Sequence, residues 1–220
     1  MNRPNNEKQS SEIWVNKFTE DSAQDFREQL LAKSEEDPSG VIQINIDSYG
    51  GSVDALAKMI ETMDELPNQF LTRISGKAMS CGAILASHGD IRFVGELSSV
   101  MVHNISWGVG GDVTNMVSVT DEAQRINKRM MGLLAKNCGK SYTALQKEIK
   151  ASTNSKEIWL DAEEAVEFGI CDFVGTPQLL EHRQTQLLHA PTKIRAEGID
   201  LEMFAPEQPK KKTKKKARKR

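Results

Sequence analysis

The sequence predicts a single α/β domain with parallel β-strands, and three observations support this. The chain has 220 residues, which suffices for one such domain with a core of its own. Its composition is globular, with 38% apolar and 27% charged residues. Segments with the alternating, β-branched pattern of strands are followed in turn by segments with helical spacing. This alternation favours parallel strands joined by right-handed crossovers.

The first elements show the pattern clearly. A strand is predicted over residues 12–18, and Thr19 is placed to cap a helix that runs to about Lys33. The segment VIQINI (41–46) alternates with period two, so it is predicted to be a strand. The helix after it has an apolar stripe and ends before Pro67. That stripe consists of Val53, Leu56, Met59, Ile60, Met63 and Leu66.

The remaining elements continue the alternation. Asp161 is expected to cap a helix, with Glu164 three residues later and Gly169 directly after its end. After Pro177, a polar helical segment is expected to run to about His189. The other predicted strands are 70–75, 91–94, 98–104 and 170–175, with a turn at 76–80, and the predicted helices are 81–89, 113–137, 141–152 and 161–169.

Charge is distributed unevenly along the chain. The last segment, 210–220, holds 9 of the 29 basic residues and no acidic one, which leaves 20 basic and 31 acidic residues and a net charge of −11 elsewhere. We expect a disordered basic tail there that binds nucleic acid or an acidic protein, or that only aids solubility. The other expected divisions are a flexible arm (1–10), the folded domain (11–177) and a polar C-terminal extension (178–209).

The sequence argues against several classes of protein. No stretch approaches the roughly 20 apolar residues that a membrane span needs. The polar N-terminus has no signal-peptide pattern. The three cysteines, Cys81, Cys138 and Cys171, are scattered and form no cluster with histidine that suggests a metal site. We therefore expect a cytoplasmic protein that has no membrane association, metal or other cofactor.

Two glycine-containing turns between a strand and a helix carry similar chemistry. They are IDSYGGSV (46–53) and RISGKAMSCGA (73–83). Glycine permits a sharp turn and leaves backbone N–H groups unobstructed, and a helix N-terminus adds partial positive charge. Two such turns side by side could direct N–H groups at one developing oxyanion. The same pattern also fits two tight turns that bind no ligand.

Ser80 begins the helix after the second turn, where a serine is often only an N-cap. A catalytic serine would need a base within hydrogen-bond reach. Of the four histidines, His103 ends a buried strand just before a glycine-rich loop and is the candidate base. A polar residue at a strand end also needs no function. The small residues that would let a substrate backbone approach Ser80 are Gly76, Ala78, Gly82 and Ala83.

These segments resemble those of the ClpP peptidases. GKAMSCGA (76–83) resembles the family's nucleophile turn, VMVHN (100–104) its histidine strand, IDSYGGSV its glycine turn and LDAEEAVEFGICDFV (160–174) its C-terminal helix and strand. Order and spacing agree over about residues 12–175. The sequence resembles the ClpP-like proteases of phage head-maturation modules at least as closely as it resembles housekeeping ClpP.

The resemblance implies an α/β ClpP/crotonase-like fold with βαβ repeats. It also implies a serine endopeptidase that assembles into a heptamer-like ring and cleaves peptides or unfolded proteins inside a chamber, through an acyl-enzyme. Position by position, Ser80 falls on the nucleophile and His103 on the general base. The backbone N–H groups of Gly50 or Gly51, and of Cys81, fall on the oxyanion hole.

The third triad member departs from the family pattern. The family has an aspartate twelve residues before the glycine that ends the later helix, and the same count back from Gly169 reaches Glu157. A glutamate can orient a histidine, but its longer arm changes the geometry. Asp161 is the nearest aspartate, and its expected capping role explains it without catalysis. We expect Glu157 rather than Asp161 to complete the triad.

The parts that would govern assembly also depart from the family. The glycine-rich segment SWGVGGD and the helix after it correspond to the protruding "handle" strand and helix, over about 105–137, which pairs rings. The arginine–aspartate pairing that helps couple rings is missing near Glu157, which argues against stacked rings. Gln43 and Asn45 stand where the family has aromatic residues of the pocket in which the ATPase docks, which weakens the case for a standard AAA+ unfoldase partner.

Three alternatives fit parts of the pattern. The same fold could carry a crotonase-type acyl-CoA enzyme, although no acidic pair suited to that chemistry is evident. A ring-forming scaffold or regulatory paralogue with a degraded triad would explain Glu157. A Ser–Lys dyad could use Lys77 as the base, but Lys77 is only three residues from Ser80 and is expected to be solvated.

Overall fold

The computed structural model describes residues 12–106, 113–152, 156–177, 179–180 and 186–187. These residues form a seven-stranded sheet in which β1, β2, β3, β4 and β7 are consecutive neighbours and β5 and β6 branch from β3. Pairing in this sheet is parallel except between β5 and β6. The predicted α/β class with a mainly parallel sheet is therefore confirmed.

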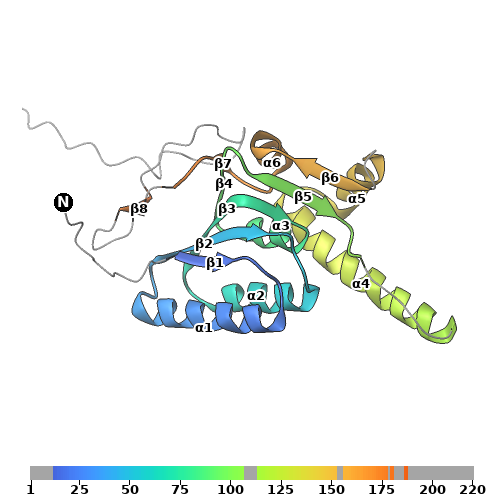
Figure 1. The fold of residues 1–220 in the computed structure, drawn as a ribbon, viewed down its shortest axis with the longest axis horizontal. Helices are drawn as coiled ribbons and strands as arrows, with labels where there is room; N and C mark the ends of the chain where they lie inside the picture. The colour runs from blue at the N-terminus through green and yellow to red at the C-terminus, as the bar shows by residue number, and fades with distance from the viewer. Residues whose placement is uncertain (1–11, 107–112, 153–155, 178, 181–185, 188–220) are drawn as a thin grey trace, which may run out of the picture.

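Figure 1 shows α1 and α2 packed side by side beneath β1 and β2, while α4 extends away from the sheet. The strands are β1 (Glu12–Val15), β2 (Val41–Ser48), β3 (Gln69–Met79), β4 (Ile91–Val94), β5 (Ser99–His103), β6 (Glu157–Leu160) and β7 (Phe173–Val174). The helices are α1 (Glu20–Glu36), α2 (Val53–Glu65), α3 (Cys81–Ala86), α4 (Val113–Asn137), α5 (Tyr142–Ala151) and α6 (Ala162–Phe168). No helix of the described chain is long and apolar enough to cross a membrane.

The predicted helix caps are present. Thr19 caps α1 in a capping box with Ser22. Asp161 caps α6 in a reciprocal box with Glu164, and Gly169 ends that helix with φ of 97°. Each cap satisfies N–H or C=O groups that the helix itself leaves without partners. These local signals explain why α1 and α6 begin where the sequence predicts.

The predicted turn at 76–80 is wrong. β3 continues to Met79, because Gly76, with φ of 104°, accommodates a bulge instead of ending the strand. Against β2, Ile46 pairs with Ile74 but Ser48 pairs with Ala78, so β3 carries two extra residues there. Before the bulge β3 pairs with β4, and after it β3 pairs with β5. The bulge therefore brings the end of β3 beside β5.

The C-terminal half differs from the prediction in two further places. β6 was not expected, yet it pairs with β5 along its whole length. The helix predicted after Pro177 is also wrong where the chain is described, because β8 (Leu179–Leu180) and β9 (Gln186–Leu187) form an antiparallel pair. The expected arm, the strand part of the handle (107–112) and the basic tail lie outside the described residues.

Arg92 on β4 is the centre of a buried polar network. It forms an ion pair with Asp172, and its Nε lies 2.9 Å from Asp172 Oδ2. Its Nη1 donates to the backbone carbonyls of Ser87, Asn137 and Gly169, at 3.4, 3.0 and 3.1 Å. These carbonyls lie at the C-terminal ends of α3, α4 and α6. One side chain thus links β4, the residue before β7 and three helices.

Replacing Asp172 should test the strength of this network. Asp172→Asn leaves the Arg92 charge buried without its anion, so we expect the free energy of unfolding to fall by about 3–5 kcal/mol. Urea denaturation measures this. Glu122→Gln is the control, because it breaks the exposed pair with Arg125 and should cost less than about 1 kcal/mol. If the two substitutions lowered the free energy of unfolding equally, the buried network would not contribute the stability expected of it.

Candidate active site

Ser80 lies at a strained strand-to-helix elbow. It follows β3 directly, precedes α3 and has φ of 55° and ψ of −117°. Among the described residues, only Ser80 and Lys156 are non-glycine residues with positive φ. Such backbone strain costs energy and is typical of functional sites. Although Ser80 occupies the N-cap position, its side chain makes no capping hydrogen bond. Its backbone N–H donates to Met101 O on β5, at 2.9 Å.

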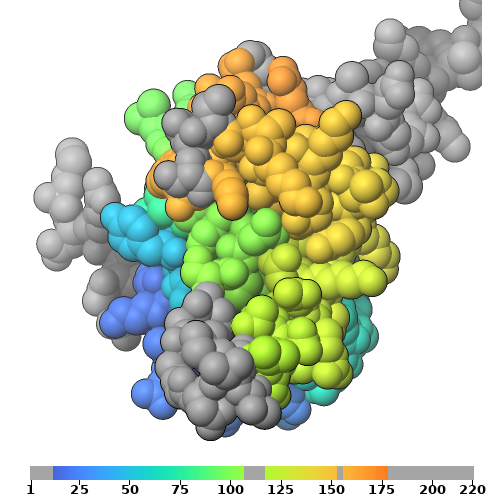
Figure 2. Space-filling model, turned by 90° about the vertical axis from the view of Figure 1, so that its right-hand side faces the viewer, coloured from blue at the N-terminus to red at the C-terminus, as the bar shows by residue number. Residues whose placement is uncertain are grey.

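The structure brings Ser80 and His103 together. His103 is the last residue of β5, and its Nε2 lies 2.9 Å from Ser80 Oγ. This is hydrogen-bond distance, so a neutral imidazole can accept the hydroxyl proton. His88, the other histidine in the described part of the chain, instead contacts Asp64 on α2. Figure 2 shows the surface of β5 and the residues after it (green) between the β2 region (cyan) and α4 and α5 (yellow-green to yellow).

The glycine turn after β2 packs directly against this elbow. Gly50 has φ of 96°, and a Cβ there would lie 2.8 Å from Met79 O and 2.9 Å from Ser80 Cβ. Only glycine therefore fits. The Gly50 N–H donates to Ser48 Oγ, at 3.1 Å, and is already engaged. The N–H groups of Gly51 and Cys81 form no hydrogen bond to a backbone carbonyl among the described residues. Of the expected oxyanion donors, these two are therefore the better candidates.

The Cys81 side chain ties the two turns together. Its Sγ donates to Gly51 O, at 3.3 Å, and the residue is buried. Burial raises the pKa of the Cys81 thiol, so the thiol stays protonated near neutral pH. A protonated, buried thiol is a poor nucleophile, so Cys81 does not compete with Ser80 for that role.

Glu157 lies beside His103 but does not hydrogen-bond to it. The two residues are direct partners across the antiparallel β5–β6 pair, which puts their side chains on one face of the sheet. The Glu157 carboxylate instead accepts a hydrogen bond from Trp159 Nε1, at 3.1 Å. The carboxylate of Asp161 is engaged in the α6 cap, where its Oδ1 accepts from Glu164 N at 2.9 Å. Glu157 is thus the nearer candidate by strand register.

Lys77 is not placed to act as a base. Its Nζ lies 2.7 Å from Asp47 Oδ1 and 4.5 Å from the centre of the Tyr49 ring. The hydrogen bond to Asp47 raises the pKa of the Lys77 ammonium. A lysine that is held protonated cannot take the serine proton, so this geometry argues against a Ser–Lys dyad.

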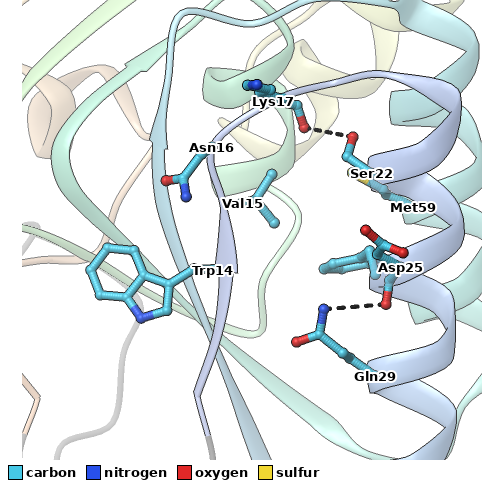
Figure 3. Close-up of a pocket in the computed structure, with 9 residues that line it drawn as sticks. Trp14, Val15, Asn16, Lys17, Ser22, Asp25, Gln29 and Met59 are labelled. Carbon is cyan, nitrogen blue, oxygen red and sulfur yellow. Dashed lines mark hydrogen bonds between the residues drawn. The ribbon is translucent and has the colours of Figure 1, made fainter.

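A separate pocket of about 250 Å³ lies between β1 and α1. Figure 3 shows Trp14 and Val15 from β1 opposite Asp25 and Gln29 from α1. Its lining includes neither Ser80 nor His103, so it is distinct from the candidate site. Within the described residues, no group of three or more His, Cys, Asp or Glu side chains could hold a metal ion.

Comparisons with known proteins point to one family. A family model described as Clp protease matches residues 8–178. The chain is 32% identical over 148 residues to "ATP-dependent Clp protease proteolytic subunit 2" of Corynebacterium diphtheriae, covering 66% of this chain and 72% of the relative. It is 31% identical over 150 residues to the proteins of the same name from Corynebacterium efficiens and Corynebacterium glutamicum, covering 67% of this chain and 73% and 72% of the relatives.

Proposed function

The chain belongs to the Clp protease family, and on that premise we propose that it is a serine-type endopeptidase with Ser80 as nucleophile and His103 as general base. The observation that carries the proposal is the 2.9 Å contact between His103 Nε2 and Ser80 Oγ at a strained elbow. Family membership supports a peptidase, and the geometry supports this assignment of roles.

The reaction proceeds in two stages. His103 Nε2 takes the Ser80 proton as Oγ attacks a peptide carbonyl, and the N–H groups of Gly51 and Cys81 hold the oxyanion. Each such donor contributes about 3 kcal/mol to the transition state. His103 then gives the proton to the leaving amine, and water hydrolyses the acyl-enzyme. Gly50 contributes through the close approach of the two turns, because its own N–H is bound to Ser48.

Glu157 completes the triad in this proposal. A carboxylate beside the imidazole selects the correct tautomer and stabilises the imidazolium that forms during attack. Cross-strand pairing supports this role for Glu157, whose carboxylate has a second oxygen beyond the one that Trp159 binds. The role requires the glutamate side chain to turn toward His103, because the two residues form no hydrogen bond in this arrangement.

The proposal extends to assembly and partners. The family resemblance supports self-association into a heptamer-like ring whose chamber admits peptides or unfolded proteins. Gln43 and Asn45 are buried and hydrogen-bonded to each other, so polar side chains occupy the strand positions where the resemblance places aromatic residues of the ATPase pocket. Activity is therefore proposed to be independent of a standard AAA+ unfoldase. The basic segment 210–220 is proposed to bind nucleic acid or an acidic protein.

A fluorophosphonate probe tests the nucleophile. The full-length protein should be labelled at Ser80, as located by peptide mapping. Ser80→Ala should abolish labelling and peptide cleavage, and His103→Ala should slow both by about 10²- to 10⁴-fold because the general base is lost. Ser141→Ala is the control, since Ser141 only caps α5 and should retain full labelling.

The same experiment separates the alternatives. Absence of labelling in a sample that light scattering shows to be an assembled ring would favour a non-catalytic scaffold. Thioester turnover that survives Ser80→Ala would favour a crotonase-type enzyme on the same fold. Either result would reject the serine peptidase.

A second pair of substitutions tests the third member. Glu157→Gln should lower kcat/KM for a fluorogenic peptide by about 10²-fold or more, because an amide cannot stabilise the imidazolium. Asp161→Asn should change it little, because asparagine also caps helices well. The opposite result, with Asp161→Asn inactive and Glu157→Gln active, would transfer the role to Asp161.

A further inference from the structure

The two residues after His103 are held by side-chain amides from two helices. Asn127 on α4 accepts a hydrogen bond from Ile105 N–H at its Oδ1, at 2.9 Å. Its Nδ2 donates to Asn104 Oδ1, at 3.1 Å. Gln146 on α5 donates to the same Asn104 oxygen from its Nε2, at 2.8 Å. Asn104, Asn127 and Gln146, with the Ile105 N–H, form what we call the amide clamp.

The clamp lies where the sheet stops supporting the chain. Parallel pairing of β5 with β3 ends at Met101, and its antiparallel pairing with β6 ends at His103 itself. Beyond His103, the described ladders supply no backbone partner. The direction of the chain leaving His103 is therefore set by the clamp, together with the packing of Ile105 against the core.

We propose that Asn127 is a positioning residue for His103, acting through Asn104 and Ile105 as the centre of the amide clamp. The inference rests on the proposed function, since it concerns the general base of that reaction. It also gives α4 a role in the chemistry, because the helix that extends from the body in Figure 1 holds the segment after the base.

A positioning role predicts a different outcome from a folding role. Three hydrogen bonds between partly buried groups contribute modestly to folding. A misplacement of the base by about 1 Å can slow a reaction by as much as 10²-fold. Loss of the clamp should therefore slow the chemistry of molecules that remain folded. It should not reduce the number of molecules able to react.

The test compares Asn127→Ala with Gln124→Ala in the full-length protein. Gln124 is exposed and lies on the same helix, one turn from Asn127. Each protein reacts with a small alkyl fluorophosphonate, which reaches Ser80 without contacts along a peptide groove. For Asn127→Ala we expect a maximal labelling rate about tenfold lower, an unchanged half-saturating probe concentration and complete labelling at the end point. Gln124→Ala should match the wild type.

A second pair separates hydrogen bonding from shape. Asn104→Asp keeps the oxygen that accepts from Asn127 and Gln146, so it should retain most of the labelling rate. Asn104→Leu has a similar shape without an acceptor, so its rate should fall about tenfold. Hydrogen exchange at the Ile105 amide should accelerate in Asn127→Ala, because that N–H loses its acceptor.

The outcomes are distinct. A wild-type protein that the probe never labels at Ser80 rejects the proposed function, and the inference with it. A labelled wild type with unchanged rates in Asn127→Ala and Asn104→Leu rejects the inference alone. A reduced labelled fraction with an unchanged rate also rejects it, because that result indicates partial unfolding.

Discussion

The buried Arg92 guanidinium holds together the elements that carry the candidate site. Its hydrogen bonds reach the C-terminal ends of α3, α4 and α6, whose carbonyls have no partners within their own helices. The opposite end of α3 begins at Ser80, α4 carries Asn127, and α6 follows the strand that contains Glu157. A buried cation is costly unless it is paired, and Asp172 with these carbonyls supplies the pairing. One side chain therefore links the far ends of three helices, of which α3 begins next to Ser80 and α4 carries Asn127.

The branching of β3 brings the two candidate catalytic residues together within this framework. A strand that paired with β4 along its whole length would place its end away from β5. The bulge at Gly76 lets β3 change partners, so Ser80 emerges beside β5 and its N–H bonds to Met101. His103 ends that same neighbouring strand, two residues further on. The contact between serine and histidine is thus a consequence of sheet topology.

The sequence predicts those features that depend on local signals. The caps at Thr19 and Asp161 follow from neighbouring residues alone, and so do the alternating helices and strands. The turn predicted at 76–80 is wrong because a glycine is equally typical of a turn and of a bulge. The pairing of β3 with β5, which the local sequence does not show, decides for the bulge. β6 is short, and its existence depends on a partner distant in sequence. The resemblance to the family indicated Ser80 and His103 as the candidate nucleophile and base, but it did not give the distance between them.

The sequence predicts side-chain hydrogen bonds least well, because each polar group has several possible partners. Nothing in the sequence indicates that Ser48 occupies the Gly50 N–H or that Trp159 binds Glu157. The amide clamp is of the same kind, since its three amides lie on separate elements. Such contacts arise only after the elements have packed.

Backbone strain connects these observations. The two described non-glycine residues with positive φ are Ser80 and Lys156, and they adjoin β3 and β6, the two strands that pair with β5. Ser80 is the strained residue at the elbow, whereas Lys156 directly precedes Glu157 and turns the chain into β6. The Ser152 hydroxyl donates a hydrogen bond to the Glu157 carbonyl. Strain persists only where surrounding contacts over-determine it. At Ser80 these contacts are the packed Gly50 turn and the N–H bond to Met101, and they hold the strained residue whose hydroxyl contacts the His103 imidazole.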